Sequence, residues 1–159
     1  MTGRIPGAGK RGKGFLETRK QYETTEYTEQ YSVFSKFFPS VDITKRIISC
    51  AIEVHSALGS GLLESVYEEA LAHEFTLRKI SYVRQKEIHL RYKGQNVGTH
   101  RIDYLVEDAV IVELKATEFL HKVYEAQVLT YLRALDKRVG LLINFNVVRL
   151  KDGLKRLIV

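Results

Sequence analysis

The sequence predicts an α/β fold in which a mixed β-sheet is flanked by helices. Two observations support this prediction. First, the domain begins with two stretches whose apolar residues have the spacing of helices. Second, the following stretches have the alternating or wholly apolar pattern of strands, and a third helical stretch lies between them. The 159 residues provide one domain and a shorter extension.

The extension is expected to cover residues 1–40. Residues 1–14 contain five of the eleven glycines and one of the two prolines, so we expect disorder there. Residues 15–38 are mixed, and both a short docked helix and a loose segment remain open. Pro39-Ser40 marks the boundary, which places the domain at residues 41–159.

Two helices are expected at the start of the domain. Asp42 or Thr44 can cap the first helix, and Gly59-Ser60-Gly61 ends it. The second helix is expected from about Leu62 to Lys79. Its apolar residues should form the buried side, and they are Leu63, Val66, Tyr67, Ala70, Leu71 and Phe75.

The pattern then changes to strands. Residues 88, 90 and 92 alternate as apolar positions before a turn at Lys93-Gly94. Further strands are expected at residues 97–106 and 109–116. A third helix at about 118–135 follows, then a strand at 139–145 and a short last strand at 155–159. This order of elements gives a mixed central sheet.

Composition restricts the class of protein. The net charge is +6, shared equally between residues 1–40, with seven Lys/Arg and four Asp/Glu, and the remainder, with eighteen and fifteen. The domain is therefore only mildly basic. A single cysteine, Cys50, excludes an internal disulfide and a cysteine-based zinc cluster. We expect a cytoplasmic protein without a secretory signal or a membrane span.

The segment Val110–Ala116 carries the first candidate site residues. It is nearly all apolar, as expected for a strand buried on both faces, yet it contains Glu113 and Lys115. Side chains at i and i+2 share a strand face, so these two lie side by side. Buried charges are costly unless they are paired or bind a metal. A specific reason for this pair is therefore expected.

The preceding strand supplies a second acid, Asp103. A three-residue loop of Glu107 to Ala109 would set Asp103 opposite Glu113 on the same sheet face. A two-residue loop would place the two carboxylates on opposite faces. A site shared by both acids therefore requires the longer turn, or a bulge that restores the register.

Two carboxylates on one face suit a hard divalent cation. Mg²⁺ accepts a few carboxylates and keeps waters and substrate phosphate oxygens as its other ligands. A nearby lysine can orient the attacking water or help deprotonate it. The metal lowers the pKa of that water and polarises the phosphorus centre. Two acids and a lysine on paired strands are therefore the minimum set of side chains needed for metal-dependent phosphodiester hydrolysis.

Three motifs carry a family resemblance. Asp103 followed by Glu113-x-Lys115 resembles the signature of PD-(D/E)XK nucleases. Gln127-x-x-x-Tyr131 on the third helix is similar to the motif that follows the catalytic strands in exonuclease-like members. Gly61-Leu-Leu-Glu64-Ser-Val-Tyr67 matches the motif of the GxxExxY protein family, a branch of that superfamily. The resemblance covers roughly residues 42–159, with Ile102 where the signature often has proline.

The resemblance implies a restriction-endonuclease-like core and a role for each matched residue. The metal ligands would be Asp103, Glu113, the Leu114 carbonyl and Glu64, the last directly or through water. Lys115 would be the catalytic lysine, and Gln127 and Tyr131 would support the site and the substrate backbone. The implied cofactor is Mg²⁺, with Mn²⁺ as an alternative. The implied partner is nucleic acid, with DNA preferred over RNA.

Simpler interpretations remain open. Glu113 and Lys115 can be an ion pair beside a solvated groove, and Glu64 can simply favour the dipole of its helix. Tyr67 and Tyr131 are expected to be core aromatics whose hydroxyls find partners. The whole domain can also be a non-catalytic nucleic-acid-binding or protein-interaction module, or act on another phosphate ester. The oligomeric state stays open, a homodimer included.

Overall fold

The structure, a computed structural model, describes residues 39–159. The disorder expected for residues 1–14 and the alternatives for residues 15–38 lie outside this range. The described elements follow the predicted order of two helices, strands, a helix and strands. They are α2 (Pro39–Leu58), α3 (Glu64–Leu77), β1 (Tyr82–Tyr92), β2 (Gln95–Val106), β3 (Val110–Lys115), α4 (Lys122–Ala134), β4 (Val139–Asn144), η1 (Leu150–Gly153) and β5 (Leu154–Ile158).

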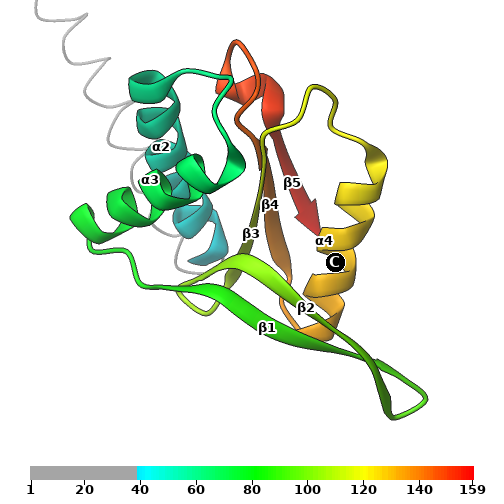
Figure 1. Cartoon of the computed structure of the whole chain (residues 1–159). Helices are drawn as coiled ribbons and strands as arrows, with labels where there is room; N and C mark the ends of the chain where they lie inside the picture. Colours follow the sequence, from blue (N-terminus) through cyan, green and yellow to red (C-terminus); the bar gives the residue numbers. More distant parts are fainter. Residues whose placement is uncertain (1–38) are drawn as a thin grey trace, which may run out of the picture. The chain divides into compact units, whose positions relative to one another are not determined.

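The predicted mixed sheet is confirmed. Its five strands lie in the order β1-β2-β3-β4-β5, and β3 and β4 run parallel while the other neighbouring pairs are antiparallel. Helices α2 and α3 cover one face of the sheet, and α4 covers the other (Figure 1). No helix in residues 39–159 is both long and apolar enough to span a bilayer.

Each face of the sheet has its own apolar core, and strand β3 contributes to both. Val112 and Leu114 pack with residues of α2 and α3, whereas Ile111 packs with Val128 and Leu132 of α4. Side chains alternate along a strand, so residues 113 and 115 share the α4 face with Ile111. The alternation therefore directs two charged side chains toward α4.

Helix α2 begins earlier than the sequence suggested. We expected a cap at Asp42 or Thr44, but the helix already includes Pro39, the first residue that the structure describes. Thr44 lies inside the helix, where its hydroxyl donates to the Val41 carbonyl at 2.9 Å.

Two residues assigned to the buried side of the second helix are exposed. Leu63 is 74% exposed and Val66 is 40% exposed. The helix starts at Glu64, two residues later than predicted, and Leu63 stands before it in an extended conformation. The exposed Leu63 and Val66 therefore belong to the loop end of α3, while Tyr67, Leu71 and Phe75 form its buried side.

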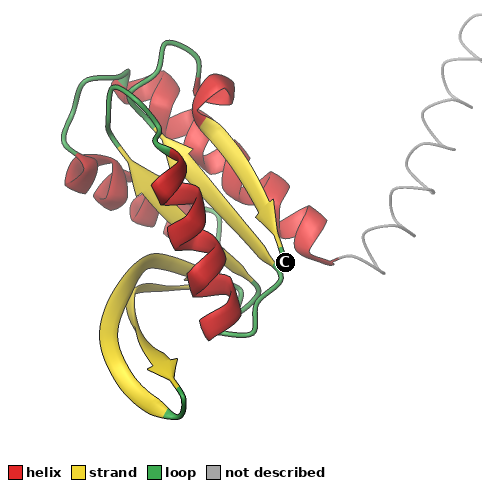
Figure 2. Cartoon of the chain, turned by 90° about the vertical axis from the view of Figure 1, so that its right-hand side faces the viewer, coloured by secondary structure: helices red, strands yellow, loops and turns green. Residues whose placement is uncertain are grey.

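Strands β1 and β2 form a long hairpin that extends past the rest of the sheet and curls (Figure 2). Ile88 is buried, as predicted, but Tyr92 near the hairpin turn is 63% exposed. The pairing shifts register between Leu90 and Arg91, which breaks the alternation that the sequence suggested. The far end of the hairpin therefore lies outside the core.

Candidate functional site

The turn between β2 and β3 has the length that a shared site requires. Pairing closes at Val106 and Val110, leaving Glu107 to Ala109 as the loop. Glu107 and Asp108 adopt left-handed conformations with φ of 49° and 51°, and the Ala109 amide donates to the Val106 carbonyl at 3.0 Å. The predicted three-residue turn is confirmed.

Asp103 lies where β2 and β3 separate. Their pairing runs from Val106↔Val110 to Tyr104↔Val112, and one further step in this register sets Asp103 against Glu113. Instead of a further ladder pair, the Asp103 Oδ2 atom accepts a hydrogen bond from the Leu114 amide at 2.7 Å. The carboxylate thus satisfies a β3 backbone donor at the point of separation, which fixes its position.

Glu113 and Lys115 form an ion pair on the α4 face. The Lys115 Nζ atom donates to Glu113 Oε1 at 3.0 Å and to the Leu114 carbonyl at 2.7 Å. It also lies 5.3 Å from the centre of the Tyr124 ring of α4, a cation–π contact. Glu113 is only 5% exposed. Within residues 39–159, its Oε2 atom is the buried side-chain polar atom that has no hydrogen-bond partner.

Burial and repulsion both act on Glu113. Burial and, next in size, the Asp103 charge raise its pKa, and with the opposing effect of Lys115 included the pKa lies at about 7. Burial alone would lower the pKa of Lys115, but the Glu113, Glu64 and Asp103 charges outweigh it and raise the pKa overall. Lys115 therefore stays an ammonium at neutral pH. An ammonium group can orient a water molecule but cannot accept its proton.

The raised pKa of Glu113 predicts that Glu113→Gln stabilises the metal-free protein at alkaline pH. The folded protein keeps its proton up to pH about 7, whereas the unfolded chain loses it near 4.5, so the free energy of unfolding falls as pH rises through this window. The gap corresponds to about 3 kcal/mol. Urea unfolding in EDTA should show that the free energy of unfolding of Glu113→Gln increases relative to that of wild type between pH 5 and pH 8. Parallel pH profiles would contradict the expectation.

Glu64 reaches the site from α3. It is the first residue of that helix, so it also favours the helix dipole. Burial raises its pKa, the Lys115 charge lowers it, and the Asp103 charge raises it. The charges of Lys115 and Asp103 therefore act on Glu64 in opposite directions. The two interpretations of Glu64 are therefore compatible.

Gln127 and Tyr131 lie together on α4. The Gln127 side-chain amide donates to the Tyr131 hydroxyl, which also lies 3.3 Å from His100 Nδ1 of β2. Burial raises the pKa of Tyr131, and the nearby Glu113 and Asp103 charges also raise it. The structure thus brings this pair to the same face as Glu113, and it adds His100, which the sequence did not indicate.

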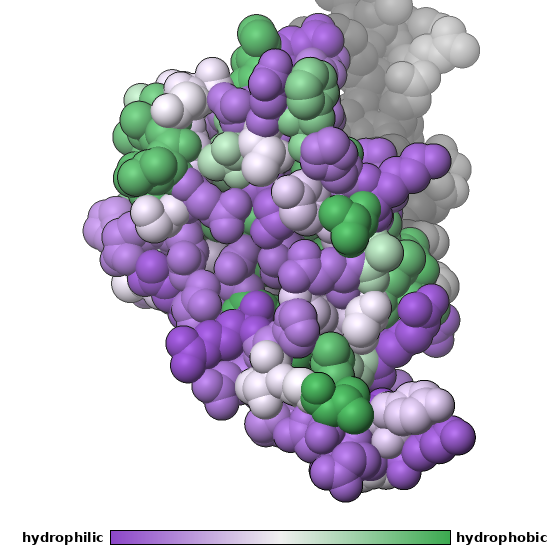
Figure 3. Space-filling view, turned by 45° about the vertical axis from the view of Figure 1, so that its right-hand side comes forward, coloured by the Kyte–Doolittle hydropathy of each residue, from purple (hydrophilic) through white to green (hydrophobic). Residues whose placement is uncertain are grey.

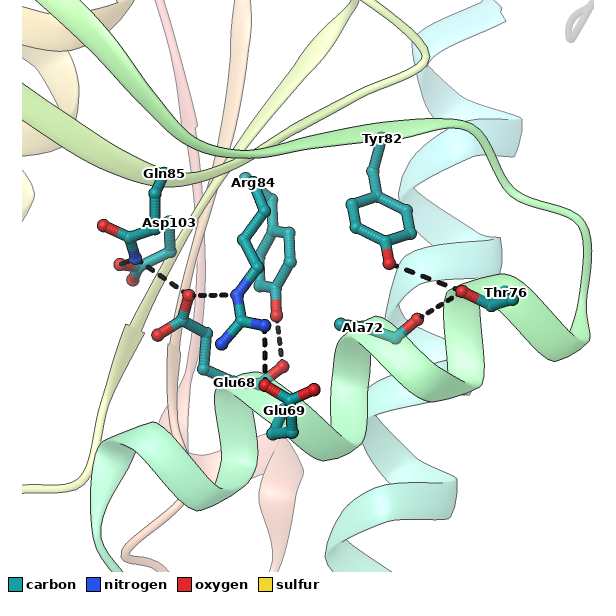
Figure 4. A network of polar contacts seen from close by, with 9 residues as sticks. Glu68, Glu69, Ala72, Thr76, Tyr82, Arg84, Gln85 and Asp103 are labelled. Atoms are coloured by element: carbon teal, nitrogen blue, oxygen red, sulfur yellow. Dashed lines mark hydrogen bonds and ion pairs between the residues drawn. The ribbon is translucent and has the colours of Figure 1, made fainter.

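A polar network behind Asp103 was also missed from the sequence (Figure 4). The Gln85 amide donates to Asp103 Oδ1 at 3.3 Å and to Glu68 Oε1 at 2.8 Å. Arg84 donates to Glu68 at 2.6 Å and to Glu69 at 2.6 Å. Gln85 adopts a φ of 50°, unusual for a non-glycine residue in a strand. The network ties Asp103 to α3.

The comparison with protein families agrees with this geometry. Residues 41–157 match the model of the PD-(D/E)XK nuclease superfamily. The chain belongs to that superfamily. Asp103, Glu113 and Lys115 lie within the matched range. The chain matches no curated protein and no solved structure.

Members of the PD-(D/E)XK nuclease superfamily act on nucleic acids and usually use divalent metals. In residues 39–159, no three His, Cys, Asp or Glu side chains are grouped to hold an ion by themselves. The donor set here is sparser, with Asp103 and Glu113 as carboxylates. The partnerless Oε2 atom of Glu113 is a buried carboxyl oxygen that a cation would satisfy. Such a pair of carboxylates suits a hard divalent cation that retains water and substrate oxygens as its other ligands.

His55 and Tyr67 have structural partners. His55 Nε2 lies 2.9 Å from the Val147 carbonyl. The Tyr67 hydroxyl donates to the Gly59 carbonyl at 2.8 Å and accepts from the Leu62 amide at 3.2 Å, while its ring stacks on Phe145. The expectation that Tyr67 is a core aromatic with a satisfied hydroxyl is confirmed.

Proposed function

We propose that this protein hydrolyses phosphodiester bonds of nucleic acid, preferentially DNA, with Mg²⁺ as the metal and Mn²⁺ as a substitute. One observation carries the proposal. The Oε2 atom of Glu113 is buried without a hydrogen-bond partner on the face that also carries Lys115. A buried carboxylate with an unsatisfied oxygen is costly in a domain that only has to fold. It is useful where a cation binds.

The metal would be held by Asp103 and Glu113, with the Leu114 carbonyl as a third donor. That carbonyl already accepts from Lys115, but a carbonyl oxygen has two lone pairs and keeps one free. Glu64 would add a carboxylate from α3, directly or through water. The bound metal would supply Lewis-acid polarisation of the phosphate and a water of lowered pKa.

The remaining site residues would orient the substrate. Lys115, held protonated by its acidic neighbours, would balance phosphate charge and position the attacking water. The aromatic ring of Tyr124 would keep its ammonium in place. Gln127 and Tyr131 would hydrogen-bond the substrate backbone from α4. In this scheme each group acts as a fixed donor or charge, which needs little movement during reaction.

We further propose that the chain belongs to the GxxExxY branch and that residues 41–159 form its nuclease domain. The geometry gives each motif residue a task. Gly61 adopts a φ of 93°, which L side chains rarely adopt. Glu64 begins α3 near the site, and Tyr67 fixes the loop that leads to it. We place the protein in the cytoplasm, where the buried thiol of Cys50 stays reduced.

A cleavage assay tests the proposed function. The full chain is incubated with labelled single- and double-stranded DNA and RNA, in Mg²⁺, Mn²⁺ or EDTA, beside Lys115→Ala and Glu113→Gln. We expect metal-dependent cleavage by wild type and its loss in both variants. Equal activity in wild type and variants would indicate a contaminant and refute the proposal. Binding without cleavage in any metal would favour a non-catalytic binding module instead.

A further inference from the structure

A groove of about 410 Å³ lies between the far half of β1 and the C-terminal half of α4. Residues of β1 line one side of it and residues of α4 the other; Figure 1 shows the hairpin passing the end of α4. Its lining includes two arginines and a histidine but no acidic side chain: His89, Leu90, Arg91, Thr130, Arg133 and Ala134. Most of the surface in Figure 3, where α4 and the hairpin meet, is hydrophilic.

The two arginines of this groove differ from most others in the domain. Arg46, Arg84 and Arg101 each hold a carboxylate, at distances of 2.6, 2.6 and 3.0 Å. Within residues 39–159, by contrast, neither Arg91 nor Arg133 has an ion pair or a side-chain hydrogen bond. Their guanidinium groups are therefore available to an external anion, and the planar fork of donors matches phosphate oxygens.

The helix dipole explains the presence of a basic residue at only one of these two positions. Arg133 lies in the last turn of α4, where a cation favours the helix dipole. Arg91 is exposed on a strand and has no such reason to be basic. The convergence of both on one concave surface, without an acid between them, is what points to a shared anionic ligand.

The groove and the candidate site both involve α4 and the β1–β2 hairpin. Tyr131, whose hydroxyl contacts Gln127 and His100, is followed on α4 by Arg133. On the hairpin, His100 pairs with Ile88, next to His89 of the groove. Helix α4 advances about 14 Å from Tyr124, which covers Lys115, to Arg133. A B-form strand rises roughly 3.4 Å per nucleotide, so this distance corresponds to about four nucleotides.

We propose that this groove binds the phosphodiester backbone of the strand being cut, about four nucleotides from the scissile phosphate, with Arg91 and Arg133 as its phosphate contacts. The placement of the groove about four nucleotides from the scissile phosphate rests on the proposed nuclease function. The contact between the two arginines and phosphate does not. The groove would then set the length of substrate that the domain holds. It would supply two further basic contacts in a domain that is only mildly basic.

Binding in EDTA tests this inference without catalysis. Fluorescence anisotropy of the full chain is measured with a labelled single strand and with a duplex at several KCl concentrations. The variant is Arg91→Ala/Arg133→Ala. We expect at least about a tenfold loss of affinity, and a plot of log K against log[salt] shallower by about 1.4 for the single strand or about 1.8 for the duplex, as two lost contacts predict. The substrate form with the tighter wild-type binding identifies the source of the phosphates.

Two controls make the result specific. Arg156→Ala removes an exposed arginine from β5, at the opposite sheet edge, and should leave the slope unchanged. Arg91→Lys/Arg133→Lys keeps the charge and should restore most of the slope. If the alanine variant unfolds like wild type and binds with wild-type affinity and slope, the inference is wrong. If the slope changes but no metal supports cleavage, the groove stands and the nuclease proposal fails.

Discussion

Asp103→Asn is expected to lower metal-dependent cleavage by about 10³-fold while leaving the fold intact. Loss of a metal ligand removes several kcal/mol of transition-state stabilisation, and about 4 kcal/mol corresponds to this factor. The asparagine side-chain oxygen can still accept the hydrogen bond that Leu114 donates to Asp103 at 2.7 Å. The free energy of unfolding should therefore change by no more than about 1 kcal/mol, because the buried Leu114 amide keeps its acceptor and only the exposed 3.3 Å bond from Gln85 is lost.

The matched control for this substitution is Asp103→Ala. It removes both the charge and the acceptor, so it should lose cleavage equally but also destabilise the domain by about 1–3 kcal/mol. Single-turnover cleavage and urea unfolding separate the two effects. Magnesium titration should show weakened binding in both variants. Wild-type cleavage by Asp103→Asn would remove Asp103 from the metal site, whereas equal instability of both variants would assign it a purely structural role.

The register at Asp103 shows how far the sequence reaches. Two acids interrupt two apolar strands, and of a two-residue and a three-residue loop only the longer one lets them face the same side without a bulge. The loop of Glu107 to Ala109 has that length. Here a chemical requirement predicted a backbone detail, because side-chain alternation in a strand allows two outcomes and one of them is useless for a metal site.

Contacts made across the fold were not predictable in the same way. Gln85 reaches Asp103 because its backbone adopts a φ of 50°, and no glycine or turn motif marks that position. Tyr124 covers Lys115 only because α4 packs on that face of the sheet. Its spacing of three residues before Gln127 was the one available signal. Such contacts depend on tertiary packing, which local periodicity does not encode.

The errors at helix ends have a related cause. Leu63 and Val66 fit an amphipathic helix by spacing, but spacing does not say where the helix begins. The extended Leu63 lies in the loop, outside α3. Pro39 looked like a break in the chain and instead lies within α2. Both positions depend on capping and on first-turn geometry, which several residue types satisfy.

Tyr67→Phe is expected to destabilise the domain by about 1–3 kcal/mol, and Tyr67→Ala by about 3–5 kcal/mol. The phenylalanine keeps the stacked ring, whose centre lies 4.5 Å from that of Phe145, but loses the hydroxyl that contacts Gly59 and Leu62. The alanine variant also leaves a cavity, because Tyr67 is fully buried. Urea unfolding of both variants measures the two contributions separately.

The same substitution tests the link between the loop and the site. Residues 59–62 lead directly into α3, and the Tyr67 hydroxyl holds both ends of that loop. Without it, Glu64 loses the fixed approach that brings it within reach of Lys115 and Asp103. Supporting contacts around metal ligands are typically worth 10- to 100-fold, so Tyr67→Phe should reduce cleavage at least about tenfold. The reduction in cleavage should also be seen without urea, where the variant is fully folded.

Tyr82→Phe is the appropriate control for Tyr67→Phe. Its hydroxyl makes a 3.4 Å contact with Thr76 on the surface, away from the loop. It should change the free energy of unfolding by less than about 0.5 kcal/mol and leave cleavage unchanged. If Tyr67→Phe loses stability but keeps full activity, Glu64 is not positioned by this loop. The tyrosine of the Gly-x-x-Glu-x-x-Tyr motif would then serve folding alone, and its spacing from Glu64 would reflect only their shared helix.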